Sequence, residues 1–125
     1  FIKNIIKKRR VNLFNHGKNF RDYTYVDDVT SYIIACFEKV RGMKNYYKIF
    51  NIGGENTIRI DKLLSIIENI LKKKAKVNLV KKNKLDPPKS LASNKNIKLF
   101  TKKNFKTKLI DGVKICINSM KAEGI

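Results

Sequence analysis

The sequence predicts an α/β or α+β fold, in which short strands and amphipathic helices alternate along one chain of 125 residues. Apolar residues recur every three or four positions in several stretches, and this spacing is typical of helices that bury one face. The stretches between them are short and rich in β-branched and aromatic residues, which favour strands. The predicted strands are not clearly adjacent, so we expect the sheet to be completed elsewhere.

The apolar spacing predicts five helices. Their expected ranges are 1–10, 28–40, 60–74, 93–100 and 107–121. Gly42 is a natural stop for the second helix, and three lysines at 72–74 suit the negative end of the third. Ser93 is placed to cap the fourth helix.

Between the helices, the expected strands are 11–14, 21–26, 46–52 and 77–79. The first strand leads into a polar loop, 15–19, in which Gly17 can take the positive φ of a turn. After the last strand, Pro87 restricts Asp86 to extended geometry. We therefore expect a stiff extended loop around Asp86.

Charge is the strongest compositional signal, with 29 basic residues, 10 acidic residues and a net charge of +19. This excess invites a nucleic-acid partner. However, only five basic residues are Arg, and the Lys are spread along the whole chain. Lys, Asn and Ile are frequent together and share A/T-rich codons, so base composition explains the charge more simply. We expect nucleic-acid binding to be unlikely.

Cysteine usage indicates a reducing compartment. Cys36 and Cys116 lie far apart, each on an apolar helical face, so we expect free core thiols and a cytoplasmic location. One His and no Cys-x-x-Cys pair predict no metal site. No apolar run approaches membrane-spanning length and no signal peptide is visible, so we expect no membrane partner. The chain starts at Phe1 within an apolar helical pattern, and we expect a piece of a longer protein.

The stretch 21–29 carries the candidate binding chemistry. Arg21 lies where a short strand leads into a helix, and its planar guanidinium suits two phosphate oxygens at once. The alternative is a structural ion pair between Arg21 and Asp22 or Asp28. Asp27 and Asp28 are expected to cap the helix that follows.

Three motifs resemble those of a known family. They are Val-Asn-Leu-Phe-Asn-His-Gly at 11–17, Arg-Asp-Tyr-Thr-Tyr-Val-Asp-Asp at 21–28 and Phe-Asn-Ile-Gly at 50–53. The chain is similar to the C-terminal part of NAD-dependent nucleotide-sugar epimerases and dehydratases, which are extended short-chain dehydrogenases/reductases. Within them it is most like bacterial UDP-glucuronate 4-epimerases. The resemblance implies a Rossmann-like α/β fold whose N-terminal NAD-binding part is absent here, with 1–125 as a single incomplete unit.

The resemblance implies a UDP-sugar site. In such enzymes the backbone at Asn12 and Phe14 binds the uracil, with the Phe14 ring beside it. Arg21 corresponds to a diphosphate ligand and Asp86 to a ribose ligand, and Asn83 stands where relatives often carry a second phosphate Arg or a Gln. From the residues alone, core packing for Phe14 and a turn role for Asp86 remain open. His16 is expected to be a solvated loop residue.

The sequence departs from the family pattern around this site. Leu85 replaces the usual Gly before the ribose-binding carboxylate, and Ser93 replaces an Asp. With Asn83 in place of Arg or Gln, phosphate binding is expected to weaken, or to pass to nearby lysines at 81, 82 or 84. Gly53 and Gly54 lack the spacing of a dinucleotide-binding loop.

The resemblance implies NAD as the cofactor, bound by the missing N-terminal part. In the family NAD⁺ takes a hydride from the sugar C4, a Tyr takes the hydroxyl proton, and the hydride returns to the other face. The Gly-rich loop and the Tyr-x-x-x-Lys pair that do this are not in the sequence, so no catalytic residue is assigned. We expect the UDP-sugar-binding part of an epimerase for surface polysaccharide precursors, inactive alone and homodimeric when complete. The alternatives are a related dehydratase or decarboxylase, or a non-catalytic basic nucleic-acid-binding module.

Overall fold

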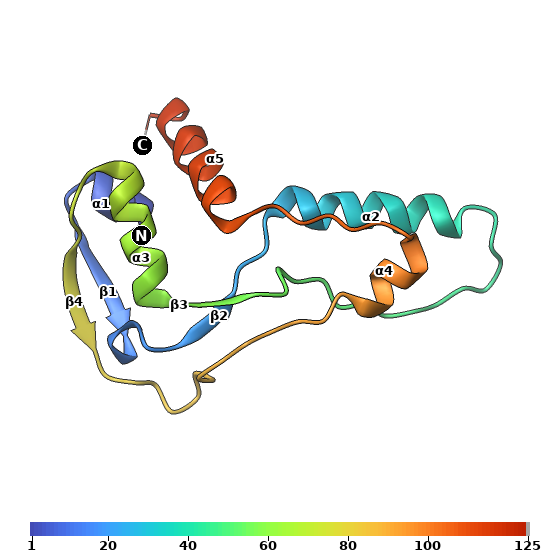
Figure 1. Ribbon diagram of the computed structural model, residues 1–125, viewed down its shortest axis with the longest axis horizontal. Helices are drawn as coiled ribbons and strands as arrows, with labels where there is room; N and C mark the ends of the chain where they lie inside the picture. The colour runs from blue at the N-terminus through green and yellow to red at the C-terminus, as the bar shows by residue number, and fades with distance from the viewer. Residues whose placement is uncertain (125) are drawn as a thin grey trace.

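The computed structural model describes residues 1–124, in which short strands and helices alternate (Figure 1). The helical elements are α1 (Ile2–Ile6), the 3₁₀ turn η1 (Asn15–Gly17), α2 (Val26–Val40), α3 (Ile60–Leu71), α4 (Lys95–Thr101) and α5 (Leu109–Ala122). The strands are β1 (Arg10–Phe14), β2 (Phe20–Asp22), β3 (Thr57–Arg59) and β4 (Lys76–Val80).

The strands form two separate pairs. β1 and β4 pair in parallel, with Arg10 opposite Lys76 and Phe14 opposite Val80. β2 and β3 pair antiparallel over three residues each. The parallel pair confirms the α/β class, because parallel neighbours require a long crossover that here includes helices α2 and α3. The carboxyl ends of β1 and β4 consequently lie at the same edge.

The core lies between α1, the β1–β4 pair and α3. Val11 and Leu13 alternate with exposed residues along β1, so they face inward. Leu63, Leu64 and Ile67 repeat at helical spacing on α3 and meet them. α5 contributes partly buried side chains from its first turns. This small cluster fixes the positions of β1 and β4, and so of the sheet edge at which their carboxyl ends lie.

Helices α2 and α4 form an arm that extends away from this core (Figure 1). Tyr32 of α2 is fully buried, and its hydroxyl oxygen accepts a hydrogen bond from the Phe105 N–H at 3.2 Å. The Phe105 ring also packs edge-on against Tyr32, with centroids 5.0 Å apart. One face of α2 nevertheless stays exposed and apolar; it comprises Val26, Ile33, Ile34 and Phe37.

The prediction of a strand at 46–52 is wrong. This stretch has no regular secondary structure, because no other strand in the described residues lies beside it to complete a ladder. Aromatic packing holds it instead: Tyr46 stacks on Phe100 at 5.5 Å between centroids, and Phe50 meets the same ring at 5.0 Å. The strand expected at 21–26 is also shorter and earlier, and β3 was not expected.

The helix ends differ from the expected caps. Tyr25, not Asp27 or Asp28, is the N-cap of α2. Asp28 accepts hydrogen bonds from the Thr107 N–H at 2.7 Å and hydroxyl at 2.9 Å, so it anchors the segment that enters α5. α1 ends at Ile6 instead of reaching residue 10, and α4 begins after Asn94 instead of Ser93.

The two cysteines are free, but they are not core thiols: Cys36 is half-buried and Cys116 is exposed. Between residues 1 and 124, no helix is both long and apolar enough to cross a membrane. In the same part of the chain, no group of three or more His, Cys, Asp or Glu side chains is arranged to hold a metal ion.

Candidate functional site

Arg21 and Asp86 meet although 65 positions separate them. A guanidinium N–H of Arg21 donates to Asp86 Oδ1, and a second donates to the Phe20 carbonyl at 2.6 Å. The two side chains are 21% and 31% exposed, so solvent reaches the pair. Arg21 is therefore in an ion pair, but with Asp86 and not with Asp22 or Asp28.

Asn19 is a site residue that sequence reasoning missed. Its side chain is only 1% exposed, and its Nδ2 donates to Asp86 Oδ2 at 2.6 Å. Its Oδ1 accepts from Asn15 Nδ2 at 2.5 Å, and its backbone carbonyl accepts from the Ile60 N–H at 3.0 Å. Both carboxylate oxygens of Asp86 are thus held, one by Arg21 and one by Asn19. The only sequence signal was a polar loop just before Arg21.

A tight turn places Asn15 and Asn19 beside each other. Asn15, His16 and Gly17 all have positive φ, and Gly17 lies at +73°. A Cβ added at Gly17 would lie 2.8 Å from the Cβ of Asp61, so only glycine fits against the start of α3. His16 is exposed in this turn, as expected of a solvated loop residue.

The loop that carries Asp86 is fixed to β2. The Phe20 N–H donates to the Pro88 carbonyl at 2.8 Å, and the Ser90 N–H donates to the Phe20 carbonyl at 3.2 Å. These two bonds extend the β2–β3 pair by one short parallel bridge between Phe20 and Lys89. The extended loop expected around Asp86 is present only in part, because residues 84 and 85 form a turn and residue 86 a bend, while an extended bridge forms at Lys89. This backbone holds Asp86 against Arg21.

Phe14 ends β1 at the same edge. Its side chain is 48% exposed, which excludes the core-packing alternative. Asn12 lies on the same face of β1 because strand side chains alternate. Its Oδ1 accepts from Asn78 Nδ2 on β4 at 2.9 Å. The amide of Asn12 is therefore engaged with its neighbouring strand, whereas the Phe14 ring is open to solvent.

Asn83 shapes the turn before Asp86. Its Oδ1 accepts from the Leu85 N–H at 3.0 Å, and its backbone carbonyl accepts from the Asp86 N–H at 3.2 Å. Its side-chain oxygen is thus used within its own loop. A phosphate-binding role for Asn83 stays a prediction.

Asp22 and the two glycines 53 and 54 form a packed junction behind the site. Asp22 Oδ2 accepts from the Glu55 N–H at 3.2 Å and the Ala92 N–H at 3.1 Å. A Cβ added at Gly54 would lie 2.3 Å from the Tyr23 carbonyl oxygen, and one at Gly53 would lie 2.5 Å from the Ala92 Cβ. These glycines bring chain segments together and leave no room for a pyrophosphate. Gly53 and Gly54 therefore do not form a dinucleotide-binding loop, as their spacing in the sequence predicted.

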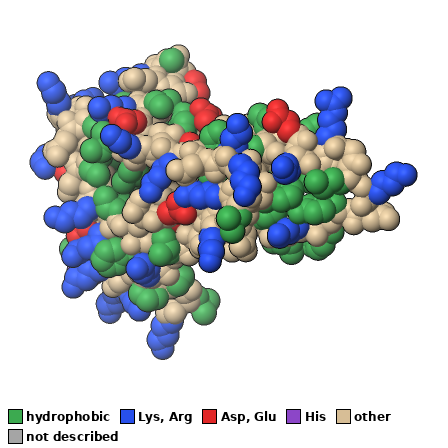
Figure 2. Space-filling model, turned by 45° about the vertical axis from the view of Figure 1, so that its right-hand side comes forward, with side chains coloured by type: hydrophobic (Ala, Val, Ile, Leu, Met, Phe, Trp, Pro, Cys, Tyr) green, Lys and Arg blue, Asp and Glu red, His purple; other side chains and the backbone are tan. Residues whose placement is uncertain are grey.

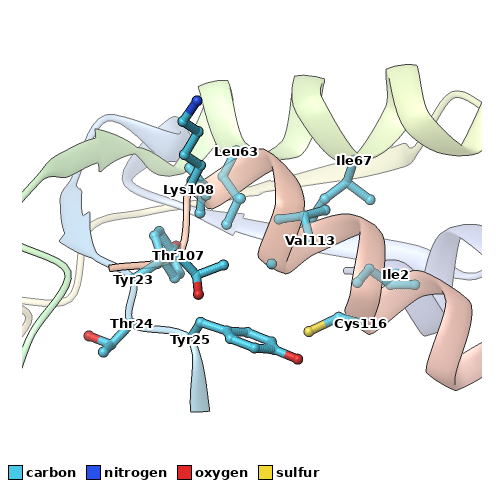
Figure 3. Close-up of a pocket in the computed structure, with 12 residues that line it drawn as sticks. Ile2, Tyr23, Thr24, Tyr25, Leu63, Ile67, Thr107, Lys108, Val113 and Cys116 are labelled. Carbon is cyan, nitrogen blue, oxygen red and sulfur yellow. The ribbon is translucent and has the colours of Figure 1, made fainter. Parts of the chain in front are cut away.

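A separate hollow of about 200 Å³ is surrounded by helix α3, helix α5 and the segment that precedes α2 (Figure 3). Tyr23 and Tyr25 line one side, and apolar side chains line the others: Ile2, Leu63, Ile67, Leu109 and Val113. Burial raises the pKa of the Tyr23 phenol, and the Arg21 guanidinium opposes that shift. Lys108 is the one charged residue of this lining. The lining is mostly apolar, so the hollow suits apolar packing better than a nucleotide. Neither Arg21 nor Asp86 lines it.

Comparison with known proteins identifies the family. Residues 1–53 match the family model described as "NAD dependent epimerase/dehydratase family". Protein CapI of Staphylococcus aureus is 30% identical over 129 residues, which cover 90% of this chain and 38% of CapI. A UDP-glucuronate 4-epimerase of Thermodesulfobacterium geofontis is 34% identical over 87 residues, covering 69% of this chain and 25% of that enzyme.

The solved structures extend the match to nearly the whole chain. The UDP-glucuronic acid 4-epimerase of Bacillus cereus, in complex with UDP-glucuronic acid and NAD, has a TM-score of 0.85 and 26% sequence identity. That match covers 98% of this chain and 38% of the Bacillus chain. The sequence thus spans well under half the length of its relatives. The fold is that of a portion of an extended short-chain dehydrogenase/reductase, and the chain belongs to the NAD-dependent epimerase/dehydratase family.

Proposed function

We propose that the chain provides the UDP-sugar-binding part of an NAD-dependent UDP-glucuronate 4-epimerase that makes precursors of surface polysaccharides. The observation that carries this proposal is the contact of Asp86 with both Arg21 and Asn19. Asn19 in turn binds Asn15, which follows the exposed Phe14 in the chain. One relative, at 34% identity, is a UDP-glucuronate 4-epimerase, and the similarity to Protein CapI supports a role in polysaccharide biosynthesis.

Each group suits one part of a uridine diphosphate. Arg21 offers several N–H donors, so it can serve diphosphate oxygens while remaining beside Asp86. Asp86 accepts hydrogen bonds, as a ribose diol requires. The Phe14 ring offers an apolar face to a uracil, and the edge backbone near Asn12 can meet the polar atoms of that base. Asn83 and the neighbouring lysines lie in the same loop and add positive or polar groups near the phosphates.

NAD binding belongs, in this proposal, to a part of the protein outside the 125 residues. The crystallised relative is in complex with NAD, and the sequence of this chain lacks the Gly-rich loop that binds NAD in the family. When bound, NAD supplies the oxidation and re-reduction of the sugar. The residues of this chain bind and orient the nucleotide end of the substrate.

The proposal is tested by the variant Arg21→Ala in the full-length protein. Removing a charge-assisted hydrogen bond is expected to weaken UDP binding by about 1.5–3 kcal/mol. Isothermal titration with UDP measures this change. Arg41→Ala is the matched control, because Arg41 is an exposed arginine at the end of α2. Unchanged UDP affinity in Arg21→Ala would overturn the role given to Arg21.

The isolated 125-residue chain is expected to have no epimerase activity. It lacks both the Gly-rich loop and the Tyr-x-x-x-Lys pair of the family. The measurement is conversion of UDP-glucuronate with added NAD, followed by chromatography, with the full-length protein as the positive control. Detectable turnover by the isolated chain would refute this expectation.

Location and assembly complete the proposal. We propose a cytoplasmic enzyme, which the two free cysteines support. The homodimer implied by the family stays a prediction, and light scattering of the full-length protein would test it.

A further inference from the structure

Two basic runs that are far apart in the sequence meet at the amino ends of the parallel strands. All four residues at 7–10 are Lys or Arg, and so are four of the five residues at 72–76. The first run leads into β1 and the second into β4, whose register places Arg10 opposite Lys76. The topology of the sheet, and not the sequence alone, therefore concentrates this charge.

The two runs enclose a hollow of about 310 Å³ at this edge. Its lining is Ile5, Lys8, Arg9, Lys73, Lys74 and Lys76. A second hollow of about 320 Å³ shares Lys73 and Lys74 and adds Lys72, Asn69 and Glu68. Figure 2 shows Lys and Arg side chains crowding the lobe on the left of the view.

Little negative charge balances these cations. The first hollow has no acidic residue in its lining. Glu68 is the acidic residue of the second lining, and it is already engaged by Lys74 at 3.0 Å and by the Ala75 N–H at 2.8 Å. Within residues 1–124, Lys8, Arg9 and Lys73 form no ion pair. Close like charges repel one another, and a bound anion would relieve that repulsion.

Helix ends explain only part of the cluster. α1 and α3 both finish here, and a cation near a helix carboxyl end is favourable. Lys7 and Lys72 occupy the two C-cap positions, and the effect falls off within the last turn, so it does not extend to Arg9, Lys74 and Lys76 further along the chain. The remaining basic side chains at the hollow therefore call for a different explanation.

We propose that this hollow, the basic strand-start pocket, binds the phosphate groups of a small polyphosphorylated ligand. Several lysines and one arginine around a compact space suit clustered phosphate oxygens, since charge-assisted hydrogen bonds are the strong ones. A compact hollow with Ile5 in its lining fits a small ligand better than a long nucleic-acid strand. The pocket lies at the opposite end of β1 and β4 from Phe14 and Asp86, so it is independent of the proposed UDP site.

The test uses the full-length protein and inorganic tripolyphosphate as the probe, measured by isothermal titration at fixed ionic strength. The pocket variant is Lys8→Gln, Arg9→Gln and Lys73→Gln together. The control variant is Lys39→Gln, Arg41→Gln and Lys44→Gln, which removes the same charge from exposed residues at the far end of α2. Circular dichroism checks that both variants fold.

The expected result is binding by the unaltered protein and a loss of at least about tenfold in the pocket variant, with less than about twofold in the control. Arg21→Ala should leave tripolyphosphate binding intact. Equal weakening in both triple variants would reduce the effect to net charge and overturn the proposal. Loss of binding in Arg21→Ala would place the anion in the UDP site and also overturn it. So would pocket-dependent binding of a single-stranded oligonucleotide together with no affinity for tripolyphosphate.

Discussion

Asp86 is held by two side chains that reach it from one short segment of chain. Arg21 takes one carboxylate oxygen and Asn19 takes the other. A carboxylate held in this way keeps a single orientation, which is what a ligand for a ribose diol requires. Asn19 is therefore a positioning residue in the proposed function: it orients Asp86 and does not meet the substrate itself.

Asn19→Ala is expected to weaken UDP binding in the full-length protein by several-fold and to lower its thermal stability. Loss of the hydrogen bond from Asn19 to the charged Asp86 is expected to lower the free energy of unfolding by about 1.5–3 kcal/mol. The substitution also leaves the Asn15 amide without its acceptor. Isothermal titration and a melting curve measure the two effects. Asn104→Ala, at an exposed loop position, is the control. A lower melting temperature with unaltered UDP affinity would show that Asn19 is merely structural.

Sequence reasoning proposed Arg21 and Asp86 as binding residues, which stays a prediction, and it did not predict that the two side chains contact each other. It offered Asp22 and Asp28 as ion-pair partners because those residues are near in sequence, whereas the actual contact closes across 65 positions. Asn94 was missed for the same reason. Its buried amide donates to the Gly53 carbonyl at 2.7 Å and accepts from the Gly53 N–H at 2.8 Å. Spacing along a chain carries no information on such distant pairs.

At the scale of elements, local periodicity was a good guide to helices. α2, α3 and α5 lie close to their expected ranges, because one-sided apolar spacing is a property of the helix itself. Strands depend on partners, and there the predictions were less accurate. The stretch 46–52 has strand-like composition but no ladder, while β3 is three residues long and forms because β2 lies beside it.

Lys98 Nζ of α4 donates a hydrogen bond to Glu55 Oε2 at 2.5 Å, and this bond connects the loop after Gly53 and Gly54 to α4. That hydrogen bond holds the pKa of Glu55 below its ordinary value of 4.5, although burial opposes the shift. The carboxyl thus has a lower pKa folded than unfolded. Its stabilising contribution is present above the unfolded pKa and is lost as the pH falls through the folded pKa.

Glu55→Gln should therefore flatten the acid side of the stability profile. In the full-length protein we expect the unaltered form to lose more unfolding free energy than the variant as the pH drops below about 4.5. Urea unfolding at a series of acidic pH values measures this difference. Glu38→Gln, an exposed position on α2, serves as the control. Parallel profiles for the unaltered protein and Glu55→Gln would contradict the role of the pair.

At the scale of the whole molecule, the chain exposes a large apolar surface for the small size of its buried core. The compact cluster around β1 and α3 lies in one lobe, whereas the arm built on α2 leaves large apolar side chains in solvent (Figure 2). Phe37 is 71% exposed and Tyr47 is 85% exposed. The sequence predicts that the sheet is completed elsewhere, and this stays a prediction. It did not show where the uncovered surface would lie, because that depends on how the arm packs.

This imbalance predicts that the isolated 125-residue chain unfolds without a sharp cooperative transition. A small core offsets little of the conformational entropy that is lost when the arm becomes ordered. Exposed apolar residues favour loosely packed states that aggregate. Thermal melts followed by near-ultraviolet circular dichroism, together with binding of a hydrophobic dye, measure both properties. The full-length protein is the comparison, and we expect it to melt sharply and to bind little dye. Because α2 carries the exposed face, Ile34→Lys with Phe37→Lys should reduce dye binding by the isolated chain more than Lys39→Gln with Lys44→Gln. A sharp melt of the isolated chain with little dye binding would mean that its two lobes suffice for a stable fold.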